Sequence, residues 1–365
     1  MYDTQKSKFT NKSQNNGYLA GRDIFFISTP FQFIIAYLIS DQFSLNSEYV
    51  ISTDYAPSVC QIQQMVDSLA IRRVRRLNYF VYNKGDRFRL FLCNTLRWLF
   101  TIRIKQTFLP NDLIFLGMPN FPSHRPLLFS NNDYQLAFFD EGAATISTLK
   151  SRYKGNLTFN FSPSNLMNFY TLFYPKRSLF YRITYYSIYP ALLGSTFDRI
   201  YRIKSHFPDN LIRPKSSVQD IWFIGGPLVD LGLIQAHHHK HMLNELLDCC
   251  NKRGFRLIYF KHRSENTTTT VPNGVEIVEQ DFPFELFYVL SSKRPLAILS
   301  VVSSVIIHMK LFFSDEVPVF YIDPTKNCET KKIKPVHKYA LNQLSIESIQ
   351  IKQFGNFMKR IGAKK

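Results

Sequence analysis

Short apolar runs alternate with longer helical segments along most of this chain, and this alternation constrains its fold more than any other feature. The apolar runs predict strands at 24–27, 49–53, 112–117, 136–139, 197–203, 220–224, 255–260, 275–278, 297–302 and 317–322. Helical spacing follows Pro30 and predicts further helices at 57–70, 237–251, 284–290 and 305–313. Strands that alternate with helices in this way are typical of an α/β fold with a mainly parallel sheet.

The length of the chain, 365 residues, indicates roughly two domains. We expect a disordered polar leader at 1–20, an N-terminal Rossmann-like domain at 21–207, a linker at 208–217, a C-terminal Rossmann-like domain at 218–330 and a basic helical tail at 331–365. The aromatic-rich segment 151–215 is expected to be helical up to the strand at 197–203 and to bridge the domains. The strand at 317–322 is expected to close the second sheet, and the tail to return to the first domain.

The chain carries no sequence signal for export or for crossing a membrane. No apolar segment precedes Ile24, and no run of about 18 uncharged apolar residues is present. The five cysteines lack paired spacing, which fits free thiols in a reducing compartment. We therefore expect a cytoplasmic protein.

The chain is strongly basic, with 45 Lys and Arg residues against 27 Asp and Glu residues and a formal net charge of +18. This imbalance predicts an anionic partner. Half of the excess lies in Ile71–Lys105, which holds ten basic residues against the single acid Asp86, with aromatic residues between them. Such a helix can lie on an anionic membrane surface, bind nucleic acid, or pack on the core with a solvated basic rim. We favour the membrane surface as its partner.

Two adjacent acids, Asp140 and Glu141, end the apolar run LAFF and are followed by Gly142. A buried strand that leads a carboxylate pair into a tight turn has this pattern, and ligands of α/β proteins bind at such strand ends. Neighbouring side chains point in different directions, so one acid would carry the chemistry and the other would brace the turn. The alternative is an ordinary strand exit with solvated acids.

Other predicted strand ends carry polar groups that suit a phosphate. Ser28 or Thr29 is expected to cap the helix after the first strand, and the hydroxyl groups of this turn, that of Thr29 included, and its backbone N–H groups can meet a ligand. In the second half, successive strands end in Gly225-Gly226-Pro227, Lys261-His262 and Ser303-Ser304, which together predict a nucleotide-phosphate pocket. His262 could instead be a structural histidine. No DxD sequence is present, which argues against a nucleotide sugar held by a metal ion. The histidines at 237–239 and 241 lack further ligands at metal-binding spacing, so they do not predict a metal site.

Five short motifs resemble, in order, those of one enzyme family. They are ISTPFQ, GGPLVDLG, KHRSE, PFEL and VVSS, and they span about Ile24 to Ile322. With the acid–acid–glycine motif, they look like glycosyltransferase family 52, which includes lipooligosaccharide sialyltransferases and is akin to the bacterial polysialyltransferases. The resemblance implies a GT-B-like fold of two Rossmann-like domains. The N-terminal domain would bind the acceptor, the C-terminal domain the nucleotide sugar, and the active site would lie in the cleft between them.

The resemblance also implies a role for each motif residue. Asp140 would be the general base that takes the proton of the acceptor hydroxyl, Glu141 would brace the turn, and Asp230 is the alternative base. His262 would protonate or hydrogen-bond the departing CMP phosphate. The donor phosphate would be held by Lys261, Ser303 and Ser304, the ribose hydroxyls by Glu285, and the base would border the turn Gly225-Gly226-Pro227.

The implied activity is inverting transfer of sialic acid from CMP-sialic acid to a hydroxyl of a cell-surface glycan, either lipooligosaccharide or capsule, without a metal ion or other cofactor. The family usually has proline after the histidine, whereas Arg263 follows His262 here, so hexose transfer from another nucleotide-sugar donor stays open. A third hypothesis, from another class, is a non-enzymatic protein that binds nucleic acid or lipid through its basic charge.

For the enzyme, the expected partners are a nucleotide-sugar donor, a glycan or glycolipid acceptor and the inner face of the bacterial inner membrane, with no nucleic acid. Relatives in family 52 suggest that the chain can form a homodimer.

Overall fold

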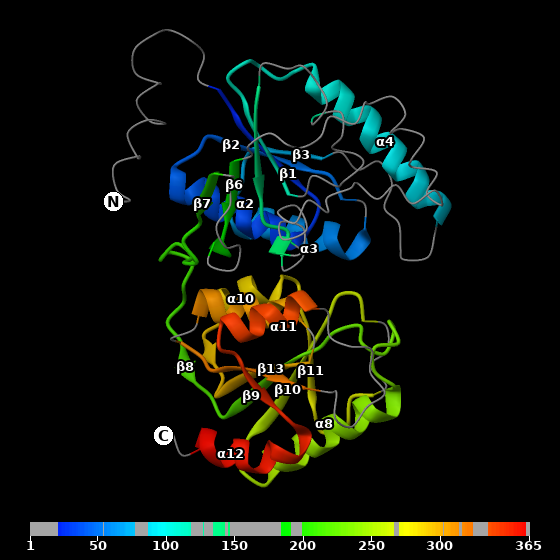
Figure 1. Ribbon diagram of the computed structural model, residues 1–365, viewed down its shortest axis with the longest axis vertical. Helices are drawn as coiled ribbons and strands as arrows, with labels where there is room; N and C mark the ends of the chain where they lie inside the picture. The colour runs from blue at the N-terminus through cyan, green and yellow to red at the C-terminus, as the bar shows by residue number, and fades with distance from the viewer. Residues whose placement is uncertain are drawn as a thin grey trace.

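The computed structural model describes residues 21–53, 55–76, 87–117, 127, 134–142, 145–146, 184–190, 199–265, 270–301, 303–313, 316–323 and 335–362. These residues form two α/β units, each built on its own parallel sheet, which lie one above the other (Figure 1). The predicted α/β class with two Rossmann-like domains is confirmed.

The first domain contains a seven-stranded sheet in the order β3-β2-β1-β4-β5-β6-β7, with every neighbouring pair parallel. Its strands are β1 (Asp23–Ile27), β2 (Ser47–Ile51), β3 (Val74–Arg76), β4 (Leu113–Leu116), β5 (Gln135–Phe139), β6 (Thr184–Ser187) and β7 (Arg199–Arg202). Its helices are α2 (Pro30–Phe43), α3 (Ala56–Ser68) and α4 (Arg87–Lys105). The strand order reverses at β1 and β4, and ligands of open α/β sheets bind beyond the carboxyl ends of strands at such a point.

The turn from β1 into α2 shows how the sequence sets this geometry. Ile24–Ile27 are buried on both faces of the sheet, which is why they form an unbroken apolar run. Thr29 then caps α2: its side chain accepts a hydrogen bond from the Gln32 backbone, and Pro30 occupies the first helical turn. The cap fixes the start of α2 directly beyond the sheet edge.

The second domain contains a six-stranded parallel sheet in the order β11-β10-β9-β13-β14-β15, whose order reverses at β9 and β13. Its strands are β9 (Asp220–Ile224), β10 (Arg256–Lys261), β11 (Glu276–Glu279), β13 (Ala297–Ser300), β14 (Val319–Ile322) and β15 (Glu347–Ile349). Its helices are α8 (Ala236–Asn251), α9 (Phe284–Leu290), α10 (Ser304–Phe313), α11 (Pro335–Gln343), the 3-10 turn η3 (Ile351–Gln353) and α12 (Phe354–Gly362). A separate two-stranded ribbon joins β8 (Ser216–Ser217) to β12 (Lys293–Arg294).

The structure corrects the expectation that the chain is helical up to residue 197. Thr184–Ser187 form β6, which lies between β5 and β7 in the first sheet. Its two tyrosines are buried, and aromatic residues favour strands. These two properties explain why so short a segment forms a strand here. The rest of the predicted helix, from 151 to 183, lies outside the described residues, as does the expected leader at 1–20.

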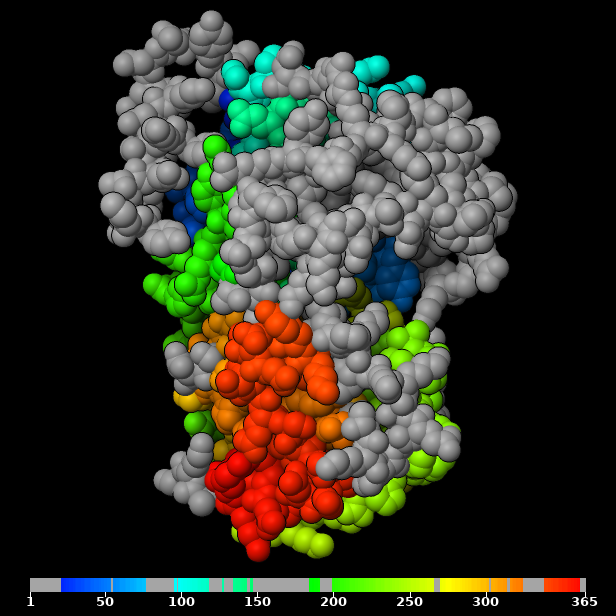
Figure 2. Space-filling model, viewed as in Figure 1, coloured from blue at the N-terminus to red at the C-terminus, as the bar shows by residue number. Residues whose placement is uncertain are grey.

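The C-terminal tail differs from the predicted helical extension in that it contains a strand. Glu347–Ile349 form β15, which pairs with β14, so the strand at 319–322 does not close the second sheet. Helix α12 follows and lies beside α8 on the second domain rather than returning to the first (Figure 1). The tail occupies a continuous part of the second domain's surface (Figure 2), and it buries Phe354, Phe357 and Met358 in that domain's core.

The basic stretch at 71–105 is not one helix. Val74–Arg76 form β3 at the edge of the first sheet, and α4 begins only at Arg87. Within the described part of the chain, no helix combines the length and apolar character needed to cross a membrane.

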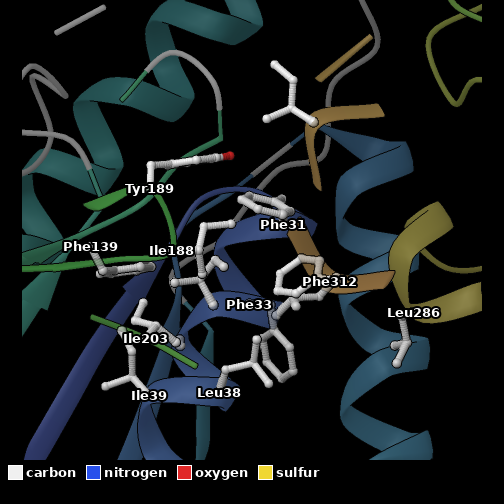
Figure 3. Packing of buried hydrophobic residues seen from close by; sticks show 14 of the residues in the cluster. Phe31, Phe33, Leu38, Ile39, Phe139, Ile188, Tyr189, Ile203, Leu286 and Phe312 are labelled. Carbon is white, nitrogen blue, oxygen red and sulfur yellow. The ribbon is translucent and has the colours of Figure 1, made fainter. Parts of the chain in front are cut away.

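The two domains meet through a shared hydrophobic cluster. Phe207, on the segment that leads from β7 to the second domain, packs against Phe312 and Phe313 of α10. Phe31 of α2 belongs to the same cluster and lies beside Tyr189, with Phe312 close by (Figure 3). Helix α10 is therefore the element of the second domain that is packed into the first.

Candidate active site

A cavity of about 560 Å³ lies between the two domains, where the carboxyl ends of both parallel sheets face each other. The first domain lines it with Thr29, Phe31, Gln61, Glu141 and Gly142, and the second domain with Ile224, Phe260, Lys261, His262, Arg263, Gln280, Phe282, Pro283, Phe284, Glu285, Ser304, Val305 and His308. Mixed apolar and polar walls at the carboxyl ends of parallel strands are typical of a ligand site.

Asp140 does not line this cavity. Its side chain is fully buried, and its two oxygens accept hydrogen bonds from the Ser187 hydroxyl at 3.0 Å and the Ile188 backbone N–H at 2.6 Å. The carboxyl group thereby ties the end of β5 to the end of β6. Burial raises the pKa of Asp140 to about 8, although both hydrogen bonds oppose the shift. Asp140, expected as the base, therefore lies in the interior and not on the cavity wall.

Glu141, expected as the brace, lies on the cavity wall. Its backbone N–H donates to the Thr145 hydroxyl at 2.9 Å, and Gly142 follows with a φ of +113°, a conformation that favours glycine. This turn directs the two side chains to different places, as the sequence pattern predicts: Asp140 points into the interior and Glu141 lies at the cavity wall. Burial raises the pKa of Glu141 to about 7. A carboxyl group with such a pKa is suited to proton transfer near neutral pH.

His262 stands on the opposite wall, at the end of β10. Its Nδ1 atom accepts a hydrogen bond from the Ser264 backbone N–H at 3.1 Å, so the neutral ring carries its proton on Nε2. Burial, and then the nearby Arg263, lower the pKa of His262 to about 4. Without a ligand the ring is therefore a neutral hydrogen-bond donor at pH 7, and an anion bound beside it would favour its protonated form.

The two cations beside His262 differ in how they are held. Lys261 donates to the Glu279 carboxylate at 2.5 Å, so its charge is already paired. Arg263 is exposed to the cavity and donates across the domain boundary to the Gln61 amide oxygen at 3.4 Å. Among the residues that the structure describes, no carboxylate forms a salt bridge with Arg263. Within that part of the chain, Arg263 therefore offers the cavity a cation that is not neutralised by a carboxylate.

Glu285 and His308 lie together on the floor of the cavity. Glu285 is 3% exposed, and its Oε1 atom lies 2.5 Å from the His308 Nδ1 atom. The His308 Nε2 atom lies 2.6 Å from the hydroxyl of Tyr189, which belongs to the first domain. Neither His308 nor Tyr189 was predicted from the sequence. Helical spacing could have indicated His308, since it follows Ser304 by four residues and shares its face of α10.

Some of the predicted phosphate-binding residues line the cavity, and another caps the helix that forms part of its wall. Thr29 and Ser304 line the cavity, and Ser304 opens helix α10, whose N-terminal N–H groups favour an anion. Ser303 does not line it; its hydroxyl accepts the Val305 backbone N–H at 3.2 Å and caps the helix.

The glycine turn predicted to border the base lies outside the cavity wall, since only Ile224 of β9 lines it. A Cβ atom on Gly225 would come within 2.6 Å of the Tyr259 hydroxyl, so close packing requires glycine at this position. Gly226, Pro227 and the alternative base Asp230 do not line the cavity either. Asp230 instead raises the pKa of Glu265 by its charge, after the larger effect of burial.

Within the described residues, no group of three His, Cys, Asp or Glu side chains is arranged to hold a metal ion. In the histidine run of α8, His239 is buried and its Nδ1 atom lies 2.8 Å from the Thr270 hydroxyl.

Two Rossmann-like domains that direct their strand ends into one shared cavity have the GT-B architecture of glycosyltransferases. The sequence model of the alpha-2,8-polysialyltransferase family matches residues 23–321. The chain therefore belongs to the alpha-2,8-polysialyltransferase family and is a glycosyltransferase. The predicted kinship with polysialyltransferases is confirmed, whereas membership of family 52 is not. No curated protein sequence matches the chain.

Several solved structures are similar to this chain. A UDP-glucosyltransferase from Polygonum tinctorium has 12% identity and a TM-score of 0.48, with 96% of this chain and 93% of that chain covered. UGT89C1 of Arabidopsis thaliana has 10% identity and a TM-score of 0.47, with 93% and 89% covered. MurG of Acinetobacter baumannii has 8% identity and a TM-score of 0.38, with 94% and 92% covered. Similarity at this level gives no information about the donor or the acceptor of this chain.

Proposed function

We propose that this glycosyltransferase moves sialic acid, with inversion, from CMP-sialic acid to a hydroxyl of a cell-surface glycan in lipooligosaccharide or capsule. The observation that carries the proposal is the cavity in a member of this family, with Glu141 on one wall and His262 with the start of α10 on the other. A proton acceptor and a phosphate-binding side on opposite walls suit a single displacement.

In this mechanism the acceptor hydroxyl attacks the anomeric carbon while the bond to the CMP phosphate breaks. Glu141 takes the proton of the hydroxyl, and its pKa of about 7 leaves it ionised at mildly alkaline pH. The His262 Nε2–H group, the Ser304 hydroxyl and the N–H groups at the start of α10 stabilise the negative charge on the leaving phosphate.

The proposed partners follow from this reaction. The donor is a nucleotide sugar that binds mainly to the second domain, and the acceptor is a glycan or glycolipid that meets the first. We propose that no metal ion is needed, because hydrogen-bond donors and positive charge on the protein take its place at the phosphate. The exposed arginines at 72 and 76 would hold the enzyme at the inner face of the membrane.

A thermal-shift titration with CMP, UMP, UDP and GDP in the presence of EDTA tests the donor. A ligand that binds only the folded chain raises its stability as ln(1 + [L]/Kd). We expect a shift with CMP, a smaller shift with UMP, and loss of the CMP shift in Ser304→Ala. A shift with UDP or GDP alone would overturn the CMP donor and leave the glycosyltransferase class intact. A CMP shift that appears only without EDTA would overturn metal independence.

Arg263 favours one alternative, a donor other than CMP-sialic acid. It stands where the resembling family usually has proline, and its guanidinium group could bind a second phosphate of a nucleoside diphosphate sugar. The same titration separates the two donors, since Arg263→Gln would then abolish the UDP or GDP shift.

A further inference from the structure

The contacts of His308 join the two domains at the cavity floor. The ring belongs to α10 of the second domain, yet it stacks on Phe31 of the first domain with centroids 3.9 Å apart and planes 12° apart. Its Nε2 atom meets the hydroxyl of Tyr189, also of the first domain. His308 and Tyr189 are 2% and 1% exposed, so these contacts are closed to bulk water.

The hydrogen bonds of this ring have one arrangement that satisfies every partner while the ring is neutral. The buried Tyr189 hydroxyl donates to Nε2, so Nδ1 carries the proton and donates to Glu285 Oε1. The opposite tautomer would turn the lone pair of Nδ1 towards a carboxylate oxygen. The Glu285 carboxylate therefore requires the proton on Nδ1, and the Tyr189 hydroxyl supports this tautomer by donating to Nε2.

Glu285 has one oxygen held by His308, and its side chain lines the cavity. Oε1 is occupied by His308, whereas no described residue forms a hydrogen bond with Oε2, and the side chain lines the cavity. A fixed carboxylate with one available oxygen is an acceptor for a ligand hydroxyl group, and a hydrogen bond to a charged acceptor is stronger than a neutral one.

We infer that His308 is a positioning residue for the nucleotide: Tyr189 and Phe31 of the first domain hold its ring, and the ring orients Glu285 towards the ribose hydroxyls of the donor. The inference rests on the proposed use of a nucleotide-sugar donor. It adds that residues of the acceptor-side domain determine how the other domain binds ribose. Donor recognition then depends on the packing of the two domains against each other.

The test measures the Kd values of CMP and 2′-deoxy-CMP by calorimetry and uses their ratio as the readout. A variant that merely damages the fold weakens the binding of both ligands by the same factor, so the ratio of their Kd values does not change. The wild-type protein is expected to prefer CMP by about tenfold, the effect of one hydrogen bond to a charged group. His308→Gln and Tyr189→Phe should bring the ratio close to one.

The matched variant His308→Asn separates positioning from packing. An Asn amide N–H can take the place of the Nδ1 donor towards Glu285, whereas a Gln amide reaches the region of Nε2. Asn also leaves the larger hole, so a packing role predicts that Asn is the worse replacement. We expect Asn to keep most of the CMP preference and Gln to lose it. Equal ratios in the two variants, or a wild-type ratio in both, would overturn the inference.

Failure of the proposed donor gives a different result. If the wild-type protein binds UDP or GDP but not CMP, the donor is wrong and the same variants are compared with that nucleotide and its 2′-deoxy form. A wild-type ratio of one with the bound nucleotide overturns the role of Glu285 and His308 but leaves the donor standing. If no nucleotide binds, both proposals are overturned.

Discussion

At the scale of single residues, Asp140 and Glu141 show that burial alone does not identify a catalytic base. Both carboxyl groups have a pKa raised by burial, to about 8 and about 7 respectively. The oxygens of Asp140 are occupied by Ser187 and Ile188, whereas Glu141 lines the cavity. This difference in position, rather than in pKa, is why we propose Glu141 as the base.

Glu141→Gln should lower kcat/KM by about 10²- to 10⁴-fold, the usual contribution of general acid–base catalysis. Glu141 is protonated below its pKa of about 7 and cannot accept a proton there. The wild-type kcat/KM should therefore rise with pH up to about 7 and then level off, whereas the residual activity of the variant should lack this rise. Measurement of CMP release from pH 5 to 9 tests both. An unchanged profile in the variant would assign the base elsewhere.

Asp140→Asn is the matched control, and its main effect should be on stability. At acid pH, where Asp140 is protonated, the substitution should cost about 1 kcal/mol or less, because a protonated carboxyl group and an amide both offer one acceptor and one donor to Ser187 and Ile188. The folded-state pKa of Asp140 is raised, so the wild-type protein loses stability as pH rises from about 4 through about 8, and Asn cannot ionise. The urea midpoint of the variant should therefore rise relative to that of the wild-type protein as pH increases. A variant midpoint that falls relative to the wild-type midpoint with rising pH would contradict this account.

The sequence allowed the positions of the motif residues to be predicted, but not the residues with which they form hydrogen bonds. Glu141, His262, Glu285, Ser304 and Thr29 all line the cavity, because each follows or opens an element at a strand end. The contact between Tyr189 and His308 joins residues 119 positions apart and depends on how two domains pack, which no local pattern encodes. The burial of Asp140 depends on hydrogen bonds to Ser187 and Ile188 at the end of β6, and that strand was not predicted.

At the scale of elements, long buried runs were predictable, whereas the short strands β3, β6 and β15 were not. Helix α9 and the central strands of both sheets lie within two residues of their predicted places, since their apolar residues form continuous runs. Strands β6 and β15 have four and three residues, too few for a period to stand out. Pairing with β5, β7 and β14 determines their conformation.

The C-terminal helix α12 should be a structural part of the second domain. Phe357 is 3% exposed and lies edge-on to Phe320 of β14, with ring centroids 4.8 Å apart. Phe357→Ala should lower the free energy of unfolding by about 3–5 kcal/mol, as for other buried aromatic residues. The neighbouring Asn356 is exposed, so Asn356→Ala should change it by less than about 0.5 kcal/mol. Urea unfolding measures both, and equal effects would show that α12 is not part of the core.

At the scale of the whole molecule, a group of exposed arginines lies outside the proposed active site. The cavity lies between the domains, whereas exposed arginines lie on the first domain at the edge strand β3 and in the last turn of α4. Of these, Arg75 is paired with Glu48 and Arg73 with Asn46. A paired charge contributes less to an anionic surface than one that faces only solvent.

Replacement of Arg72, Arg76 and Arg103 by Gln should therefore weaken binding to phosphatidylserine vesicles. Each basic residue near such a surface contributes about 1 kcal/mol, so three should change the partition coefficient by about a hundredfold. The control removes the same charge from exposed positions of the second domain, Lys240, Lys252 and Arg253, and should have little effect. Vesicle sedimentation at low and high salt measures both, because screening weakens a genuine electrostatic contact. Equal losses in the two variants would mean that net charge, rather than this face of the first domain, attracts the membrane.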